Sequence, residues 1–131
     1  MTEVHNNQTI LIVDDEPDII DLIKINLVRE GYLIHTALTG EEALKKLSND
    51  DFDIVLMDVT LPDISGIDVT KEYRRQAVGQ HHLPIIALTA HAHSDDKELC
   101  LASGMDDFMV KPLSPEALKA ILVKYASLNR L

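Results

Sequence analysis

Short apolar runs alternate with amphipathic segments along this chain. Four runs have the length of buried β-strands and cover residues 10–13, 54–57, 85–88 and 108–110, and a fifth candidate strand covers residues 32–36. Between the runs, apolar residues recur at helical spacing, as at Ile19, Ile20, Ile23 and Leu27. The pattern predicts a β-strand followed by an α-helix, repeated five times.

The predicted helices carry residues that are typical of helix ends. Pro17 stands at a suitable first helical position, and Gly31 is placed to end the same helix. Thr39 and Glu42 have the spacing of a capping box. Further helices are expected over residues 67–77, over residues 94–103 before Gly104, and after Ser114, where Pro115 takes the first position.

The predicted strands are apolar on both faces, as parallel strands covered by helices on each side should be. The fold class is therefore α/β, with a doubly wound, five-stranded parallel sheet. A length of 131 residues and a hydrophobic content of 46% suit one domain with a substantial core. We expect this domain to cover residues 9–127, with a flexible segment at 1–8 and a tail at 128–131.

Composition excludes several classes of function. The net charge is −10 and no Lys/Arg cluster occurs, which argues against direct binding to nucleic acid. No run approaches the roughly 20 apolar residues that span a bilayer, and residues 1–8 lack the pattern of a signal peptide. Cys100 is the single cysteine, so no internal disulfide forms, and we expect it on a helix face. These features predict a soluble, cytoplasmic protein.

Reactive side chains follow the apolar runs, at the strand ends where open α/β sheets bind ligands. They are Asp14, Asp15, Asp58, Thr89 and Lys111. If the fold brings these three carboxylates together, they cannot all stay ionised without a counter-ion, and Mg²⁺ prefers carboxylate and phosphate oxygens. The ammonium and the hydroxyl would complete a pocket for a dianionic tetrahedral group. The set predicts phosphoryl transfer to an aspartate, and Asp58, which stands alone, is the favoured acceptor.

Four segments in order resemble the receiver domain of two-component response regulators. They are residues 13–17, residues 56–62 with Gly66, residues 87–90 and residues 108–113. The resemblance runs from about Thr9 to Tyr125. It implies a flavodoxin-like strand order 2-1-3-4-5, a phosphoryl group received from a histidine kinase or histidine phosphotransfer domain, and later hydrolysis. It implies a phosphoacceptor switch, not an enzyme that acts on other substrates.

The resemblance assigns the metal site and the acceptor residue by residue. Asp58 matches the phosphoacceptor, and Asp14 and Asp15 match the acidic pair that holds Mg²⁺. The metal ligands would be these three side chains and the backbone carbonyl of Thr60.

The resemblance also assigns the residues that read the phosphoryl group. Lys111 matches the lysine that grips its oxygens, and the bond from Lys111 to Pro112 is expected to be cis. Thr89 and Phe108 match the switch pair, in which the hydroxyl closes on the phosphoryl group and the ring turns inward. The signal would then appear on the face of the fourth helix, fifth strand and fifth helix.

Two positions beside the acceptor are expected to tune the phosphoryl lifetime. Thr60 lies two residues after the acceptor, and His91 lies two residues after the switch threonine. Our hypothesis is that their bulk and polarity affect access of the hydrolytic water. A zinc site at His91 and His93 is not favoured, because their spacing is wrong and no cysteine supports it.

Simpler interpretations and other classes of protein stay open. Asp14 and Asp15 could cap the first helix, Asp58 could be an ordinary loop acid, and Thr89 and Phe108 could be inert core residues. A haloacid-dehalogenase-like phosphatase needs a second aspartate where Thr60 stands. A flavodoxin-like cofactor protein needs a phosphate cradle that the first loop lacks. A degenerate receiver would only bind partners.

The parent protein is a separate question. Residues 87–91, 104–108 and 111–114 resemble receivers of hybrid sensor kinases more than those of DNA-binding regulators. That resemblance implies a histidine phosphotransfer domain as partner, and an attached kinase that could be anchored in a membrane. The chain would be a stand-alone receiver or a piece of a larger protein. A second copy of the chain, bound on phosphorylation, is a further candidate partner.

Overall fold

One parallel sheet of five strands forms the centre of the molecule, in the order β2-β1-β3-β4-β5. The computed structural model describes residues 8–91 and 93–129. The strands are β1 Thr9–Val13, β2 Leu33–Ala37, β3 Ile54–Asp58, β4 Ile85–Thr89 and β5 Asp107–Val110. The helices are α1 Pro17–Val28, α2 Gly40–Asn49, α3 Gly66–Gln76, α4 Ser94–Ala102 and α5 Pro115–Asn129. The predicted fold class and strand order are confirmed.

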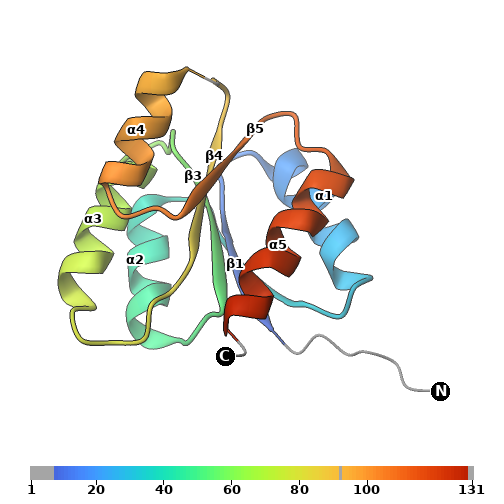
Figure 1. Cartoon of the computed structure of the whole chain (residues 1–131), viewed down its shortest axis with the longest axis horizontal. Helices are drawn as coiled ribbons and strands as arrows, with labels where there is room; N and C mark the ends of the chain where they lie inside the picture. The colour runs from blue at the N-terminus through green and yellow to red at the C-terminus, as the bar shows by residue number, and fades with distance from the viewer. Residues whose placement is uncertain (1–7, 92, 130–131) are drawn as a thin grey trace.

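Helices cover both faces of the sheet, with α1 and α5 on one side and α2, α3 and α4 on the other (Figure 1). Successive residues of a strand point to opposite faces, so each strand supplies two hydrophobic cores. Ile10 and Ile12 pack with α1 and α5, whereas Leu11 and Val13 pack with the other three helices. Cys100 is buried in this second core. The two cores fix the sheet, whose carboxyl edge carries the polar residues.

Edge strand β2 departs from the expectation of strands buried on both sides. Leu33 is 58% exposed, and His35 is exposed as well. Among the described residues, β2 pairs only with β1, so its outer side lacks a neighbouring strand. The central strands β3 and β4 are buried along their whole length. The prediction that helices cover every strand on both faces was therefore wrong for β2, because β2 is the outermost strand on one side of the sheet.

Helix ends follow the predicted residues, with one difference. The Thr39 side chain accepts a hydrogen bond from the Glu42 N–H (3.1 Å), as a capping box requires. The Glu42 carboxylate, however, accepts from the Leu38 N–H (2.8 Å), one residue before the cap. The Ala117 N–H donates to Ser114 Oγ (3.2 Å) at the start of α5. The capping box is thus shifted by one residue on its return bond.

The chain ends fall partly outside the described residues. Of the predicted flexible segment 1–8, residues 1–7 lie outside them, and of the predicted tail 128–131, residues 130–131 do. Helix α5 reaches Asn129. Within residues 8–91 and 93–129, no helix is both long and apolar enough to cross a membrane.

Candidate functional site

Adjacent strands β1 and β3 bring an acidic cluster together at the carboxyl edge of the sheet. Asp14 follows β1 directly and Asp58 ends β3, and the register Val13↔Met57 places them side by side. Carboxylate oxygens of Asp14, Asp15, Glu16 and Asp58 all lie within 4.8 Å of one another. Asp14 is completely buried and Asp58 is 4% exposed. The sequence predicted three of these four side chains as neighbours.

Lys111 supplies the positive charge of the cluster. Its Nζ lies 2.9 Å from Asp14 Oδ2, 3.3 Å from Glu16 Oε1 and 3.5 Å from Asp58 Oδ2. Lys111 follows β5, its N–H donates to the Thr89 carbonyl (2.8 Å), and its bond to Pro112 is cis as expected. Burial opposes the ammonium, but the Asp14 contact and the Asp58 charge outweigh burial and raise the pKa of Lys111. The ammonium therefore stays charged at neutral pH.

One ammonium does not balance the four carboxylates around it. Burial, together with the nearby Asp14 charge, raises the pKa of Asp58 to about 6, against the opposing effects of the Thr60 N–H and Lys111. Asp14 Oδ2 is buried with the Lys111 ion pair but no well-oriented hydrogen bond. Hard oxygen donors with an excess of negative charge are the ligands that Mg²⁺ prefers. The cluster therefore fits a divalent cation.

Neither aspartate of the acidic pair serves as the cap of α1. The N-cap residue is Glu16, which makes no capping hydrogen bond through its side chain. Asp14 Oδ1 accepts from the Glu16 N–H (2.9 Å), which closes the turn before the helix, and Asp15 is exposed. The simpler interpretation of the pair as helix caps was wrong, because the helix begins two residues later at Pro17.

A cavity of about 400 Å³ opens above the acidic cluster. Its lining residues are Asp15, Glu16, Asp58, Thr60, Ala90, His91 and Lys111. The Thr60 N–H donates to Asp58 Oδ1 (3.1 Å), and His91 is exposed at the start of the loop after β4. The structure therefore places both predicted lifetime-tuning residues beside the predicted acceptor. Their effect on lifetime stays a prediction.

The two predicted switch residues lie at different positions along the strand direction. Thr89 ends β4, is 7% exposed, and exchanges hydrogen bonds of 3.1 Å with the backbone of His91. Phe108 lies in β5 opposite Ala87, two residues before the level of Thr89. Its half-buried ring lies 5.1 Å from Lys97 Nζ of α4. Thr89 thus ends its strand at the carboxyl edge but does not line the cavity, whereas the Phe108 ring contacts Lys97 of α4.

Glu16 is the member of the cluster that the sequence analysis did not select. It lies between the acidic pair and Pro17, and the residue before a proline is held in an extended conformation. Its φ of −99° and ψ of 108° agree with that restriction. A third acid next to Asp14 and Asp15 was the available signal. Its contact with Lys111 joins residues 95 positions apart and was not readable from spacing.

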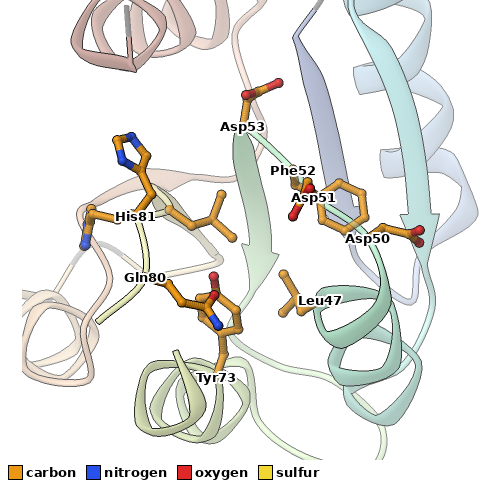
Figure 2. Close-up of a pocket in the computed structure, with 10 residues that line it drawn as sticks. Leu47, Asp50, Asp51, Phe52, Asp53, Tyr73, Gln80 and His81 are labelled. Atoms are coloured by element: carbon orange, nitrogen blue, oxygen red, sulfur yellow. The ribbon is translucent and has the colours of Figure 1, made fainter. Parts of the chain in front are cut away.

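A second polar cavity, of about 370 Å³, lies at the opposite edge of the sheet (Figure 2). Tyr73 of α3 and Leu47 of α2 line it, together with the loops that contain Asp51 and His81. None of the acidic-cluster residues belongs to it. The candidate acceptor and the candidate metal ligands therefore lie at the carboxyl edge and not in this cavity.

The histidine pair near the site lies outside the group of acidic side chains in the described residues. The rings of His91 and His93 stack with centroids 6.1 Å apart. In the part of the chain that the structure describes, the group of possible metal ligands contains the four acids and neither histidine.

Comparisons with known proteins match nearly the whole chain. A family model described as the response regulator receiver domain matches residues 10–123. Alkaline phosphatase synthesis transcriptional regulatory protein PhoP of Bacillus subtilis is 46% identical over 114 residues, which are 87% of this chain and 46% of PhoP. The chain spans about half the length of the curated relatives it matches.

Solved structures agree with this match. A CheY-like receiver domain protein of Methanospirillum hungatei superposes with a TM-score of 0.86 at 30% identity, covering 95% of this chain and 98% of that one. The receiver domain of sensor histidine kinase PA1611 from Pseudomonas aeruginosa superposes with a TM-score of 0.83 at 34% identity, covering 93% and 99%. That structure has a magnesium ion coordinated in its active-site cleft. Both a transcriptional regulator and a sensor kinase thus occur among the matches, and the expected hybrid-kinase parent stays a prediction.

Proposed function

The chain belongs to the response regulator receiver domain family, and on that premise we propose that Asp58 accepts a phosphoryl group from a phosphohistidine. The donor would be a histidine kinase or a histidine phosphotransfer domain in the cytoplasm. The observation that carries the proposal is the buried Asp58 carboxylate, which shares one sheet edge with Asp14, Asp15 and the Lys111 ammonium.

Magnesium is the proposed cofactor. The Asp14, Asp15 and Asp58 carboxylates and the backbone carbonyl of Thr60 would hold it. The bound ion would neutralise phosphoryl oxygens that the acidic cluster alone would repel. The excess of carboxylates over cations at this edge supports the assignment, as does the magnesium ion in the related PA1611 receiver domain.

The transfer step uses the chain's residues mainly to position and neutralise. One Asp58 oxygen attacks phosphorus, the new O–P bond forms as the donor's P–N bond breaks, and the released imidazole keeps the bonding pair. Lys111 Nζ lies 3.5 Å from Asp58 Oδ2, so its ammonium is close enough to contact the oxygens of a phosphoryl group on Asp58. In the later hydrolysis, water attacks phosphorus, the O–P bond breaks, and the Asp58 carboxylate and inorganic phosphate are released.

The proposed signal is a shift between two loop arrangements. Phosphorylation adds about 1.5–2 negative charges and three strong acceptors. The Thr89 hydroxyl would exchange its bond to the His91 carbonyl for one to the phosphoryl group, and the Phe108 ring would turn inward. Each new charge-assisted hydrogen bond contributes about 1.5–3 kcal/mol, whereas a swing from 1:99 to 99:1 needs about 5.5 kcal/mol. Several contacts must therefore change together on the α4-β5-α5 face.

The output of the whole protein remains a further proposal. The chain carries a net charge of −10, so we propose that this domain itself does not contact nucleic acid. A transcriptional regulatory activity or a kinase activity, of the kinds that the names of PhoP and PA1611 state, would belong to other parts of a longer protein. A receiver that only binds partners is the alternative, and phosphorylation-dependent dimerisation is a proposal for the same face.

Intact-mass spectrometry tests the proposal directly. The protein is incubated with acetyl phosphate with and without Mg²⁺, as wild type, as Asp58→Asn, and as Asp51→Asn, which changes an exposed acid at the opposite edge. We expect one phosphoryl adduct that requires Mg²⁺, disappears in Asp58→Asn and persists in Asp51→Asn. If Asp58→Asn still forms the adduct, Asp58 is not the acceptor, and if the wild type forms none, the binding-only alternative is favoured.

A further inference from the structure

Glu16 occupies the mouth of the acidic site without a role in the transfer step described above. Its side chain is 60% exposed, lines the 400 Å³ cavity, and lies 3.3 Å from Lys111 Nζ. The same ammonium lies 2.9 Å from the buried Asp14 carboxylate and 3.5 Å from Asp58. Lys111 is thus held between two inner carboxylates and one outer carboxylate.

The backbone at Glu16 directs its side chain toward the site. The Glu16 N–H donates to Asp14 Oδ1 (2.9 Å), and its carbonyl accepts from Ile19 (3.1 Å) and Ile20 (3.2 Å) at the start of α1. Pro17 restricts the same residue to an extended conformation. The backbone is therefore held on both sides, and only side-chain torsions are free. This distinguishes Glu16 from an ordinary surface acid.

We propose that Glu16 is a positioning and donor-selecting residue, which holds the Lys111 ammonium at the cavity mouth and slows the approach of dianionic phosphoryl donors to Asp58. The inference rests on the proposed phosphorylation of Asp58. A donor that enters the cavity meets the Glu16 charge before it meets the partly neutralised inner carboxylates. A phosphoryl group on Asp58 must also draw Lys111 away from Glu16. Both effects disfavour donors that carry more negative charge.

The test compares two small donors of different charge at saturating Mg²⁺. Near pH 7 acetyl phosphate is a dianion and phosphoramidate is mainly a monoanion, and intact-mass time courses give both rate constants. In Glu16→Gln the rate with acetyl phosphate should rise about three- to tenfold, and the rate with phosphoramidate should rise less. The difference should shrink in about 1 M salt, where the screening length is about 3 Å.

Asp18→Asn is the matched control. Asp18 is exposed in the first turn of α1 and does not line the cavity, so this variant makes the same change in net charge nearby. It should leave the ratio of the two rates at its wild-type value. Equal behaviour of Glu16→Gln and Asp18→Asn with both donors would overturn the inference.

Two further outcomes separate the possible failures. If the wild type is not phosphorylated by either donor, the proposed function fails and not the role of Glu16 within it. If Glu16→Gln unfolds, Glu16→Ala provides the test, because it also removes the charge and the contact with Lys111. That variant should shift the preference toward acetyl phosphate, and a wild-type preference would contradict the role of Glu16.

Discussion

Asp58 is nearly fully buried beside a second carboxylate, and its negative charge is costly there. The pKa of Asp58 rises from 3.8 to about 6, first through burial and then through the Asp14 charge. The folded state therefore binds the Asp58 proton more tightly than the unfolded state does. The stability that this proton provides is complete below pH 3.8 and is lost as the pH rises through about 6.

The substitution Asp58→Asn should accordingly stabilise the protein in the absence of divalent cations. A shift of about two pKa units corresponds to at most about 3 kcal/mol, and we expect a gain of about 1–3 kcal/mol at pH 7. The gain should fall toward zero near pH 4, where the wild-type carboxyl is protonated in the folded state. Urea unfolding in EDTA at several pH values measures both the gain and its pH dependence.

The exposed acid Asp68 in the first turn of α3 provides the control for this prediction. Asp68→Asn makes the same change in charge but removes a favourable charge at a helix N-terminus. It should not stabilise the protein at pH 7. A gain for Asp58→Asn that stays constant from pH 4 to pH 7 would mean that the ionised carboxylate is not the source of the cost.

Strand-end chemistry explains which site residues could be predicted from the sequence. Asp14, Asp58 and Lys111 each follow or end an apolar run, and parallel strands deliver such residues to one edge. The position of Glu16 against Lys111 could not be predicted in the same way. It depends on the reach of a lysine side chain that follows β5, which lies three strands away from β1, the strand that precedes Glu16. Contacts made by long side chains across a sheet edge leave no signal in local spacing.

At the scale of elements, the junction between β3 and α3 determines the position of the acceptor. Gly66 begins α3 and lies against the backbone of Asp58, because a Cβ at this position would be 2.1 Å from the Asp58 carbonyl oxygen. The Gly66 N–H also donates to the Val59 carbonyl (2.9 Å). A side chain there would have to displace backbone atoms of the residue that we propose as the phosphoacceptor.

We therefore expect Gly66→Ala to destabilise the protein and to impair the site. Forced packing of this kind costs about 1–3 kcal/mol, and the displaced Asp58 backbone should also slow phosphorylation by acetyl phosphate. Urea unfolding measures the first effect, and intact-mass time courses measure the second.

Gly79→Ala separates steric pressure from the general cost of replacing a glycine. Gly79 has a φ of +86°, and a Cβ there would meet no atom within 4 Å. Replacing it should cost about 1 kcal/mol through the left-handed backbone alone, with no change in the phosphorylation rate. If both variants slow phosphorylation equally, contact with Asp58 is not the cause.

The elements themselves were largely predictable, whereas the bonds between loops were not. The apolar runs and capping residues located every strand and the start of every helix to within a residue or two. By contrast, Arg74 of α3 donates to the Gly104 carbonyl and to Asp106, and His82 lies 2.7 Å from the same Asp106 carboxylate. These bonds join residues 24 to 32 positions apart. Such pairing depends on how α3, α4 and β5 pack, which no local pattern encodes.

At the scale of the whole molecule, the fold gathers acidic side chains of an already acidic chain at the carboxyl edge of the sheet. The net charge is −10, and the cluster of Asp14, Asp15, Glu16 and Asp58 has Lys111 as its close cation. The folded state brings these carboxylates together, and the unfolded chain separates them. A cation that binds the folded cluster therefore stabilises the fold by mass action.

Magnesium should raise the thermal stability of the wild type by this mechanism. At a free concentration of 100 times the dissociation constant, the expected stabilisation is about 2.7 kcal/mol. Asp15→Asn should keep the fold, because Asp15 is exposed, but it removes one proposed ligand. The magnesium concentration at the midpoint of its stabilisation curve should therefore be higher than for the wild type. The melting temperature is followed against MgCl₂, with NaCl at equal ionic strength to separate binding from screening. If NaCl reproduces the whole shift, or if Asp15→Asn titrates like the wild type, the acidic cluster does not bind magnesium as proposed.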